Sequence, residues 1–68
     1  MQLVKSKNVA GVEVSLWKDT NRAQVLANGK LRRNVFDLSR ADAEFNGECE
    51  YIAQLMELPE YKSGMKTL

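Results

Sequence analysis

The feature that most constrains this chain is the dipeptide Asn28-Gly29, which separates two short stretches rich in strand-forming residues. Asn-Gly is typical of tight β-hairpin turns, because both residues tolerate a positive φ. The stretch from Asn21 to Asp37 is therefore predicted to form two antiparallel strands. The length of the turn decides which side chains share a face, because a shift of one residue moves every side chain of a strand to the opposite face.

Two registers of this hairpin are open. A two-residue turn places Leu26 opposite Leu31 and leaves a poor apolar face. A three-residue loop with Gly29 in the left-handed conformation places Val25 opposite Leu31 and Leu26 opposite Lys30, and we prefer it. It gathers the apolar side chains Ala23, Val25, Leu31 and Val35 on one face. The other face then carries Arg22, Gln24, Leu26, Lys30, Arg32 and Asn34.

Another strand is predicted from Val9 to Lys18, where apolar and polar residues alternate. One face carries Val12, Val14 and Leu16, and the other carries Glu13, Ser15 and Trp17. A four-residue loop at 18–21 then places Leu16 opposite Ala23. Residues 9–36 are thus predicted to form a three-stranded antiparallel meander. For residues 1–8, an edge strand and a loose arm both remain open.

A helix is predicted over residues 39–57, because Ser39 followed by Asp42 is a variant of the capping box. Its apolar residues form one stripe that can cover the sheet: Ala41, Phe45, Cys49, Ile52 and Met56. A continuous helix is preferred, and a kink or split at Asn46-Gly47 is the alternative. Pro59 ends the helix, residues 59–62 form one further turn, and residues 63–68 form a loose tail. The expected fold is α+β, in the order βββα.

Length and composition indicate one small domain spanning residues 1–68. A monomer of this size buries only ~60% of the surface that its unfolded chain exposes, so we expect a homodimer as one means of enlarging the core. Cys49 is the only cysteine and has no partner for an internal disulfide. The chain shows neither the cationic and apolar regions of a signal peptide nor an apolar run of membrane-spanning length. We therefore expect a cytoplasmic protein with no membrane partner.

Catalysis is not indicated by any residue pattern. The chain contains no histidine, and no serine or cysteine has a recognisable base partner. Cys49 lies on the apolar stripe, where a free cysteine acts as a small hydrophobic residue. The glutamates near it lack the loop spacing of a calcium site. We expect a non-enzymatic protein with no catalytic residues, no cofactor and no metal.

Charge is distributed unevenly along the chain. Residues 1–36 hold seven Lys/Arg and two Asp/Glu, whereas residues 37–68 hold three and seven. This asymmetry either steers an anionic partner toward the sheet or neutralises itself within the fold or a dimer. The polar sheet face is predicted to bind nucleic acid, because such side chains contact phosphates and base edges. Its residues are Trp17, Arg22, Gln24, Lys30, Arg32 and Asn34. An ordinary solvated sheet face is the alternative.

The run from Trp17 through Ala43 resembles, in layout, the three-stranded-sheet-plus-helix DNA-binding domains of plant ethylene-response factors and integrase arm-binding domains. The matching segments are Arg22-Ala23-Gln24-Val25, Asn28-Gly29-Lys30, Phe36-Asp37 and Ala41-Asp42-Ala43. The resemblance implies that the sheet face reads DNA while the helix packs behind it. The chain departs from the family pattern at Asn34, where the family has a glycine, in having fewer arginines, and at Asn46-Gly47.

The alternative function belongs to a different class. A small, nearly neutral protein without an active site resembles the inhibitors that phages and mobile elements encode, including anti-CRISPR proteins. Such a protein docks on a larger protein through its acidic helix or its sheet. Tyr51 and Trp17 are natural anchors, because interface hot spots favour Tyr and Trp. The predicted protein interface consists of Glu44, Glu48, Glu50, Tyr51 and Glu57.

Overall fold

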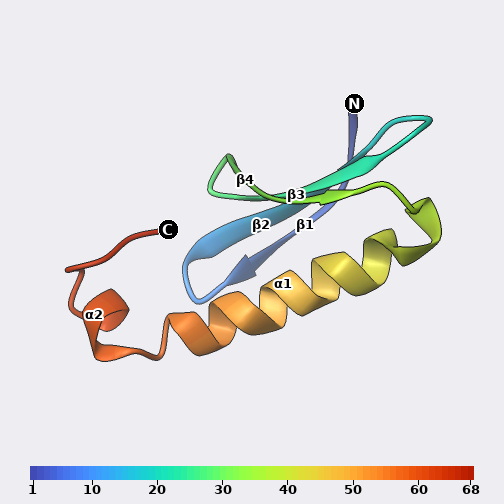
Figure 1. The fold of residues 1–68 in the computed structure, drawn as a ribbon. Helices are drawn as coiled ribbons and strands as arrows, with labels where there is room; N and C mark the ends of the chain where they lie inside the picture. The colour runs from blue at the N-terminus through green and yellow to red at the C-terminus, as the bar shows by residue number, and fades with distance from the viewer.

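The computed structural model describes residues 1–68 as an antiparallel sheet with a helix on one face (Figure 1). The strands lie side by side in chain order: β1 (Gln2–Val9), β2 (Val12–Lys18), β3 (Ala23–Ala27) and β4 (Lys30–Val35). A 3-10 turn at Leu38–Arg40 leads into helix α1 (Ala41–Leu55), and α2 (Pro59–Lys62) follows. The predicted α+β class and the packing of one helix on an antiparallel sheet are confirmed, but the sheet has four strands rather than three. Neither helix has the length and apolarity needed to cross a membrane.

The additional strand arises from a tight turn at Ala10-Gly11. Both residues have a positive φ, 51° and 86° respectively, and the pair Val9 and Val12 closes the hairpin. The backbone N–H of Gly11 also donates to Oδ1 of Asn8 at 3.1 Å. Ala is uncommon at positive φ, so the sequence pattern suggested one strand running through Gly11. Residues 2–9 instead form the edge strand β1, which was one of the two alternatives for the N-terminal segment.

The β3–β4 turn corrects the preferred hairpin register. Asn28 and Gly29 have φ values of 49° and 81°, so the turn has two residues and Leu26 lies opposite Leu31. A β-bulge follows, because Val25 pairs with Arg33 and leaves Arg32 as the extra residue of β4. The predicted three-residue loop is therefore wrong. Leu31 lies on the face opposite the core and is 52% exposed. After the bulge, Val35 faces the core and Asn34 faces away from it, as predicted.

The β2–β3 loop also differs from its prediction, without changing the faces. Lys18 pairs with Ala23, so Leu16 lies opposite Val25 rather than Ala23. The Asp19 carboxylate stabilises the loop by accepting the backbone N–H groups of Asn21 and Arg22 at 2.8 and 2.9 Å. The pairing is shifted by an even number of residues, so the same side chains point into the core.

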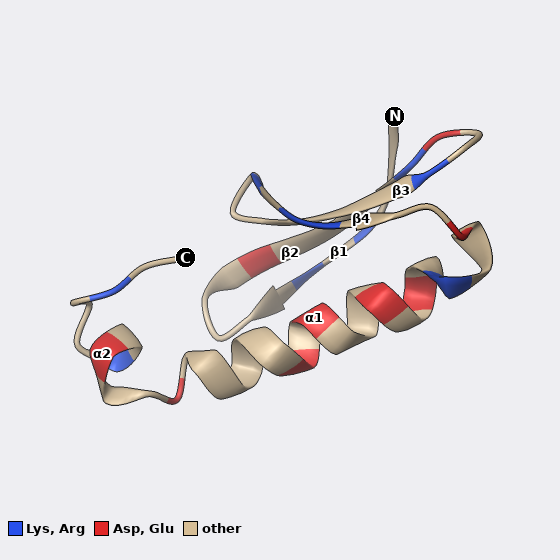
Figure 2. Ribbon diagram, in the orientation of Figure 1, with Lys and Arg blue, Asp and Glu red and all other residues tan.

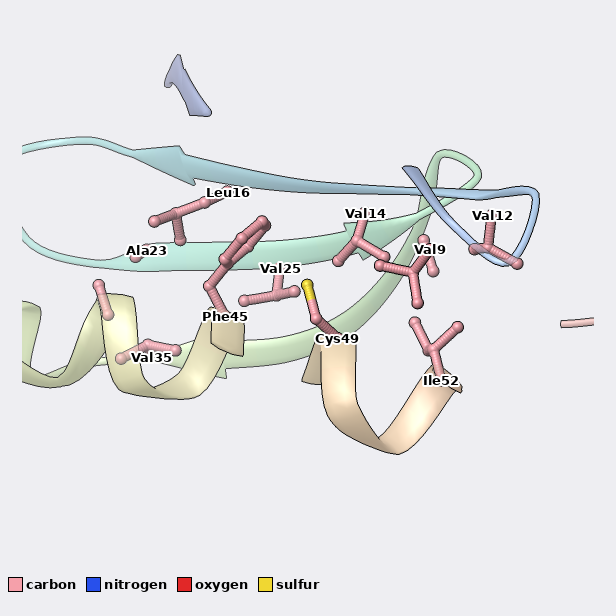
Figure 3. Close-up of a cluster of buried hydrophobic side chains, with 12 residues drawn as sticks. Val9, Val12, Val14, Leu16, Ala23, Val25, Val35, Phe45, Cys49 and Ile52 are labelled. Atoms are coloured by element: carbon pink, nitrogen blue, oxygen red, sulfur yellow. The ribbon is translucent and has the colours of Figure 1, made fainter. Parts of the chain in front are cut away.

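The core lies between the sheet and α1 (Figure 3). Its sheet residues are Val9, Val12, Val14, Leu16, Ala23, Val25, Ala27 and Val35. The helix contributes Ala41, Phe45, Cys49 and Ile52, with Met56 partly buried against the cluster. The predicted helix stripe is thus confirmed. The predicted core is confirmed on the sheet except for Leu31.

Helix α1 is continuous through Asn46-Gly47, as preferred. It starts two residues later than predicted, because the Asp37 side chain accepts the backbone N–H of Ser39 and caps the 3-10 turn that precedes α1. It ends at Leu55, and Pro59–Lys62 form the expected further turn. Residues 63–68 were expected to be a loose tail. Instead the segment folds back, and Leu68 packs against the core.

Candidate binding surfaces

The basic residues of the two edge strands face the helix side of the sheet. In β1, Lys5 and Lys7 pair with buried residues of β2, so their side chains project on the same side as the core. In β4, Lys30 and Arg33 likewise pair with buried residues of β3. Figure 2 shows these basic segments on the outer strands beside the acidic segments of α1. The basic side chains of β1 and β4 therefore project toward the side of the sheet that the acidic helix covers.

An ion cluster joins the bulge of β4 to α1. Arg33 donates from Nε to Glu48 at 2.8 Å and from Nη1 to Glu44 at 2.7 Å, while Nε of Arg32 donates to the other Glu48 oxygen at 3.0 Å. Nη2 of Arg40 lies 3.7 Å from Glu44. The hydrogen bond to Glu44 is the main cause that raises the pKa of Arg33 above its ordinary value, and the hydrogen bond to Glu48 acts in the same direction. Glu48 is only 3% exposed, and both its carboxylate oxygens are satisfied. We call these residues the β4–α1 ion cluster.

Two further acidic groups of the helical half, Asp42 and Glu57, are also ion-paired. Nζ of Lys5 lies 3.1 Å from Asp42, and its hydrogen bond lowers the pKa of that carboxyl. Nζ of Lys62 lies 3.1 Å from Glu57. Among the four glutamates of the predicted protein interface, only Glu50 lacks an ion pair. The helix therefore presents few free carboxylates, and Glu48, predicted as an interface residue, is buried.

Three of the six predicted nucleic-acid-binding residues lie away from the predicted face. The Arg32 guanidinium reaches α1 and stands 6.0 Å from the centroid of the Tyr51 ring. Nζ of Lys30 donates to the backbone carbonyl of Leu68 at 3.0 Å. Arg22 belongs to the β2–β3 loop. The two-residue turn directs Lys30 and the bulge directs Arg32 away from the predicted sheet face, whereas Arg22 precedes β3 and belongs to no strand.

The other three predicted residues, Trp17, Gln24 and Asn34, do share the face opposite the helix. They are neighbours across β2, β3 and β4, and Gln24 Nε2 donates to Asn34 Oδ1 at 3.1 Å. We call this surface the open face, because Figure 1 shows α1 on the opposite side and no helix over it. By strand register its members are Leu3, Ser6, Asn8, Glu13, Ser15, Trp17, Gln24, Leu26, Leu31 and Asn34. Glu13 is the only one that carries a charge.

Four apolar side chains on the open face form a surface that we call the Trp17 patch: Leu3, Trp17, Leu26 and Leu31. Leu3 pairs with Trp17, and Leu26 pairs with Leu31. Trp17 Nε1 donates to Ser15 Oγ at 3.0 Å, and Ser15 is only 8% exposed. Leu3 and Leu31 are each 52% exposed. Sequence reasoning missed both leucines as surface residues, although the Asn-Gly turn carried the signal for Leu31.

Cys49 offers little nucleophilic chemistry. Burial raises the pKa of its thiol above the ordinary value, with a smaller opposing effect from the Lys7 charge. The side chain lies between Phe45 and Ile52 in the core (Figure 3). A buried thiol that remains protonated is a poor nucleophile, so its position accords with a packing role.

No protein-family model, curated protein or solved structure matches this chain. The resemblance to DNA-binding domains and to phage-type inhibitors therefore stays a prediction.

Proposed function

We propose that this protein is a non-enzymatic protein-binding module that docks through the open face of its sheet. The observation that carries the proposal is the Trp17 patch, which lies on a sheet face without a covering helix and without a lysine or arginine. Contiguous apolar patches rimmed by polar groups are typical of interaction sites. The predicted inhibitor was expected to dock through its acidic helix or through its sheet. The proposal retains docking through the sheet and drops docking through the acidic helix.

The distribution of charge favours a protein over a nucleic acid. Affinity for nucleic acid comes largely from cations that neutralise phosphates. The open face offers none, and Arg32 and Arg33 are held by Glu48 in the β4–α1 ion cluster. An apolar face with amide and hydroxyl groups at its rim instead suits an uncharged surface of another protein.

The anchor of this surface is Trp17. Tryptophan is enriched among interface hot spots, because it buries a large area and loses little side-chain entropy. Its hydrogen bond to Ser15 restricts the ring in the free protein, which lowers the entropic cost of docking. Gln24 and Asn34 lie beside it and can supply hydrogen bonds at the rim.

A pair of matched leucine substitutions tests the proposal. Leu31→Glu places a charge in the Trp17 patch, whereas Leu58→Glu places one at a leucine of similar exposure, 42%, beyond the end of α1. Each tagged protein is used to capture partners from cells, and each candidate is then purified and retested for direct binding. We expect direct binding that Leu31→Glu abolishes and Leu58→Glu preserves.

Titration with labelled duplex DNA at two salt concentrations distinguishes protein docking from nucleic-acid binding. We expect no salt-sensitive binding. If DNA binds, and if Arg32→Ala weakens that binding while Leu31→Glu does not, the protein-docking proposal is overturned in favour of the nucleic-acid prediction.

A further inference from the structure

We infer that the open face takes a second copy of this chain, so that two sheets stack face to face in a two-fold symmetric dimer. This inference rests on the proposed function, because it names the occupant of the same docking surface. Four features of the molecule support it: the charge of the face, the size of the core, the form of the sheet edges and the arrangement of the apolar residues.

The charge of the open face permits self-association. A two-fold interface brings every residue near its own symmetry mate or near the mate of a neighbour, so a face rich in one charge repels itself. Here Glu13 is the only charged member. It lies beside the β1–β2 turn, one row beyond Leu26 and two rows from Trp17, so two patches can meet at their Trp17 ends without placing like charges at the centre.

The size of the core gives the dimer its driving force. Only 14 of 68 residues are buried, and domains of this size rarely obtain more than ~3–5 kcal/mol from a single core. Small proteins compensate with disulfides, metals or oligomerisation. Cys49 is the only cysteine and is buried, so no internal disulfide can form. Stacked sheets would add a second apolar layer around Trp17.

The edges of the sheet discourage the other common way of joining two sheets, which is strand addition. In β1 the register shifts at Val4, and Lys5 and Lys7 point inward toward the helix. In β4 the bulge at Arg32 interrupts the ladder. Bulges and inward-pointing charged side chains on edge strands are devices that oppose edge pairing. The face, rather than an edge, is therefore the surface left for a second copy.

The apolar residues lie along a diagonal of the open face. One row across the sheet reads Leu3, Trp17, Gln24, Asn34, and the next outward-facing row reads Ser6, Ser15, Leu26, Leu31. Apolar residues thus occupy β1 and β2 in the first row but β3 and β4 in the second. The two remaining corners are polar.

This diagonal restricts how two copies can stack. A two-fold axis parallel or perpendicular to the strands places apolar corners on polar corners. An axis along either diagonal of the face places the Trp17 patch on its own copy and sets polar corners against each other. Because such an axis is oblique to the strands, the strands of the two sheets cross at a wide angle. The dimer therefore departs from the aligned packing class, in which the strands of the two sheets lie within about 30° of each other.

Sedimentation velocity over a wide range of protein concentration tests the inference. We expect the unmodified chain and Leu58→Glu to sediment as dimers. Leu31→Glu is expected to weaken dimerisation by about 100-fold or more, because a buried charge without a partner is costly. Leu31 is 52% exposed in the monomer, so its replacement should leave far-UV circular dichroism unchanged.

Fluorescence of Trp17, the only tryptophan, supplies a second readout. We expect its emission to shift to the red on dilution, with the same midpoint as sedimentation. A chain that remains monomeric at all concentrations, or a dimer that Leu31→Glu leaves intact, overturns the inference. The two proposals fail separately: a monomer whose direct partner is lost on Leu31→Glu refutes the dimer and leaves protein docking in place.

Discussion

Replacing Glu48 by glutamine tests whether the β4–α1 ion cluster holds the last strand on the helix. The Glu48 side chain is 5% accessible and receives charge-assisted hydrogen bonds from Arg32 and Arg33. Removing one partner of a buried ion pair costs about 3–5 kcal/mol. The arginines retain 28% and 32% side-chain accessibility, and Arg33 keeps its bond to Glu44. We therefore expect a smaller loss, about 2–3 kcal/mol.

Urea unfolding followed by far-UV circular dichroism measures this loss. The matched control is Glu50→Gln, which removes an exposed carboxylate two residues along the same helix that has no ion pair. Protein concentration is held constant, because association shifts apparent stability. A change for Glu48→Gln within about 0.5 kcal/mol of the control would refute the view that Glu48 is a stabilising centre of the cluster.

Three further predictions address local features. Gly47→Ala should increase the free energy of unfolding by less than the ~1 kcal/mol that alanine normally adds to a helix, because the new Cβ would lie 3.3 Å from Nη1 of Arg33. Urea unfolding should show the full increase when the same substitution is made in an Arg33→Met background. Ala10→Asn should stabilise the protein by about 1 kcal/mol in the same assay, because Ala10 has a φ of 51° and alanine is strained there; an unchanged midpoint would contradict this. Hydrogen bonds from Ser39 lower the pKa of Asp37 below its ordinary value of 3.8, so its folded form binds fewer protons than the unfolded chain. Its stabilisation is thus present above that pH and lost as the pH falls through the lower folded pKa; the stability gap between the unmodified chain and Asp37→Asn should narrow in that acid range, and a constant gap would refute it.

The helix and the core-facing strand positions were predictable because they depend on periodicity. Val14 and Leu16 alternate with polar residues, and Phe45, Cys49 and Ile52 recur at helical spacing. Assigning a residue to the buried face requires only its position within the repeat, which is two residues in a strand and three to four residues in a helix. The even shift at the β2–β3 loop therefore left this part of the prediction intact.

The candidate site was not predictable in the same way, because it depends on turns. Ala10-Gly11 is a weak turn signal, so the sequence left both an edge strand and a loose arm open for residues 1–8. The bulge at Arg32 allows a two-residue turn and a core-facing Val35 in the same strand, a combination that neither simple register offered. Without the bulge, exposing Leu31 would also have exposed Val35. The basic face was predicted because the sequence analysis did not foresee the bulge at Arg32.

The strand order has a consequence for how the chain folds. Each strand of the sheet pairs only with its neighbours along the chain, and the ion cluster joins residues 15 and 16 positions apart. Chains dominated by such short-range contacts close small loops and fold rapidly. β1 meets the rest of the sheet only through β2, but Val9 in the core and the Lys5–Asp42 ion pair also tie it to α1. Opening of β1 would therefore break its ladder with β2 and its contacts with the helix together, so we expect the strand to open with part of the core rather than by itself.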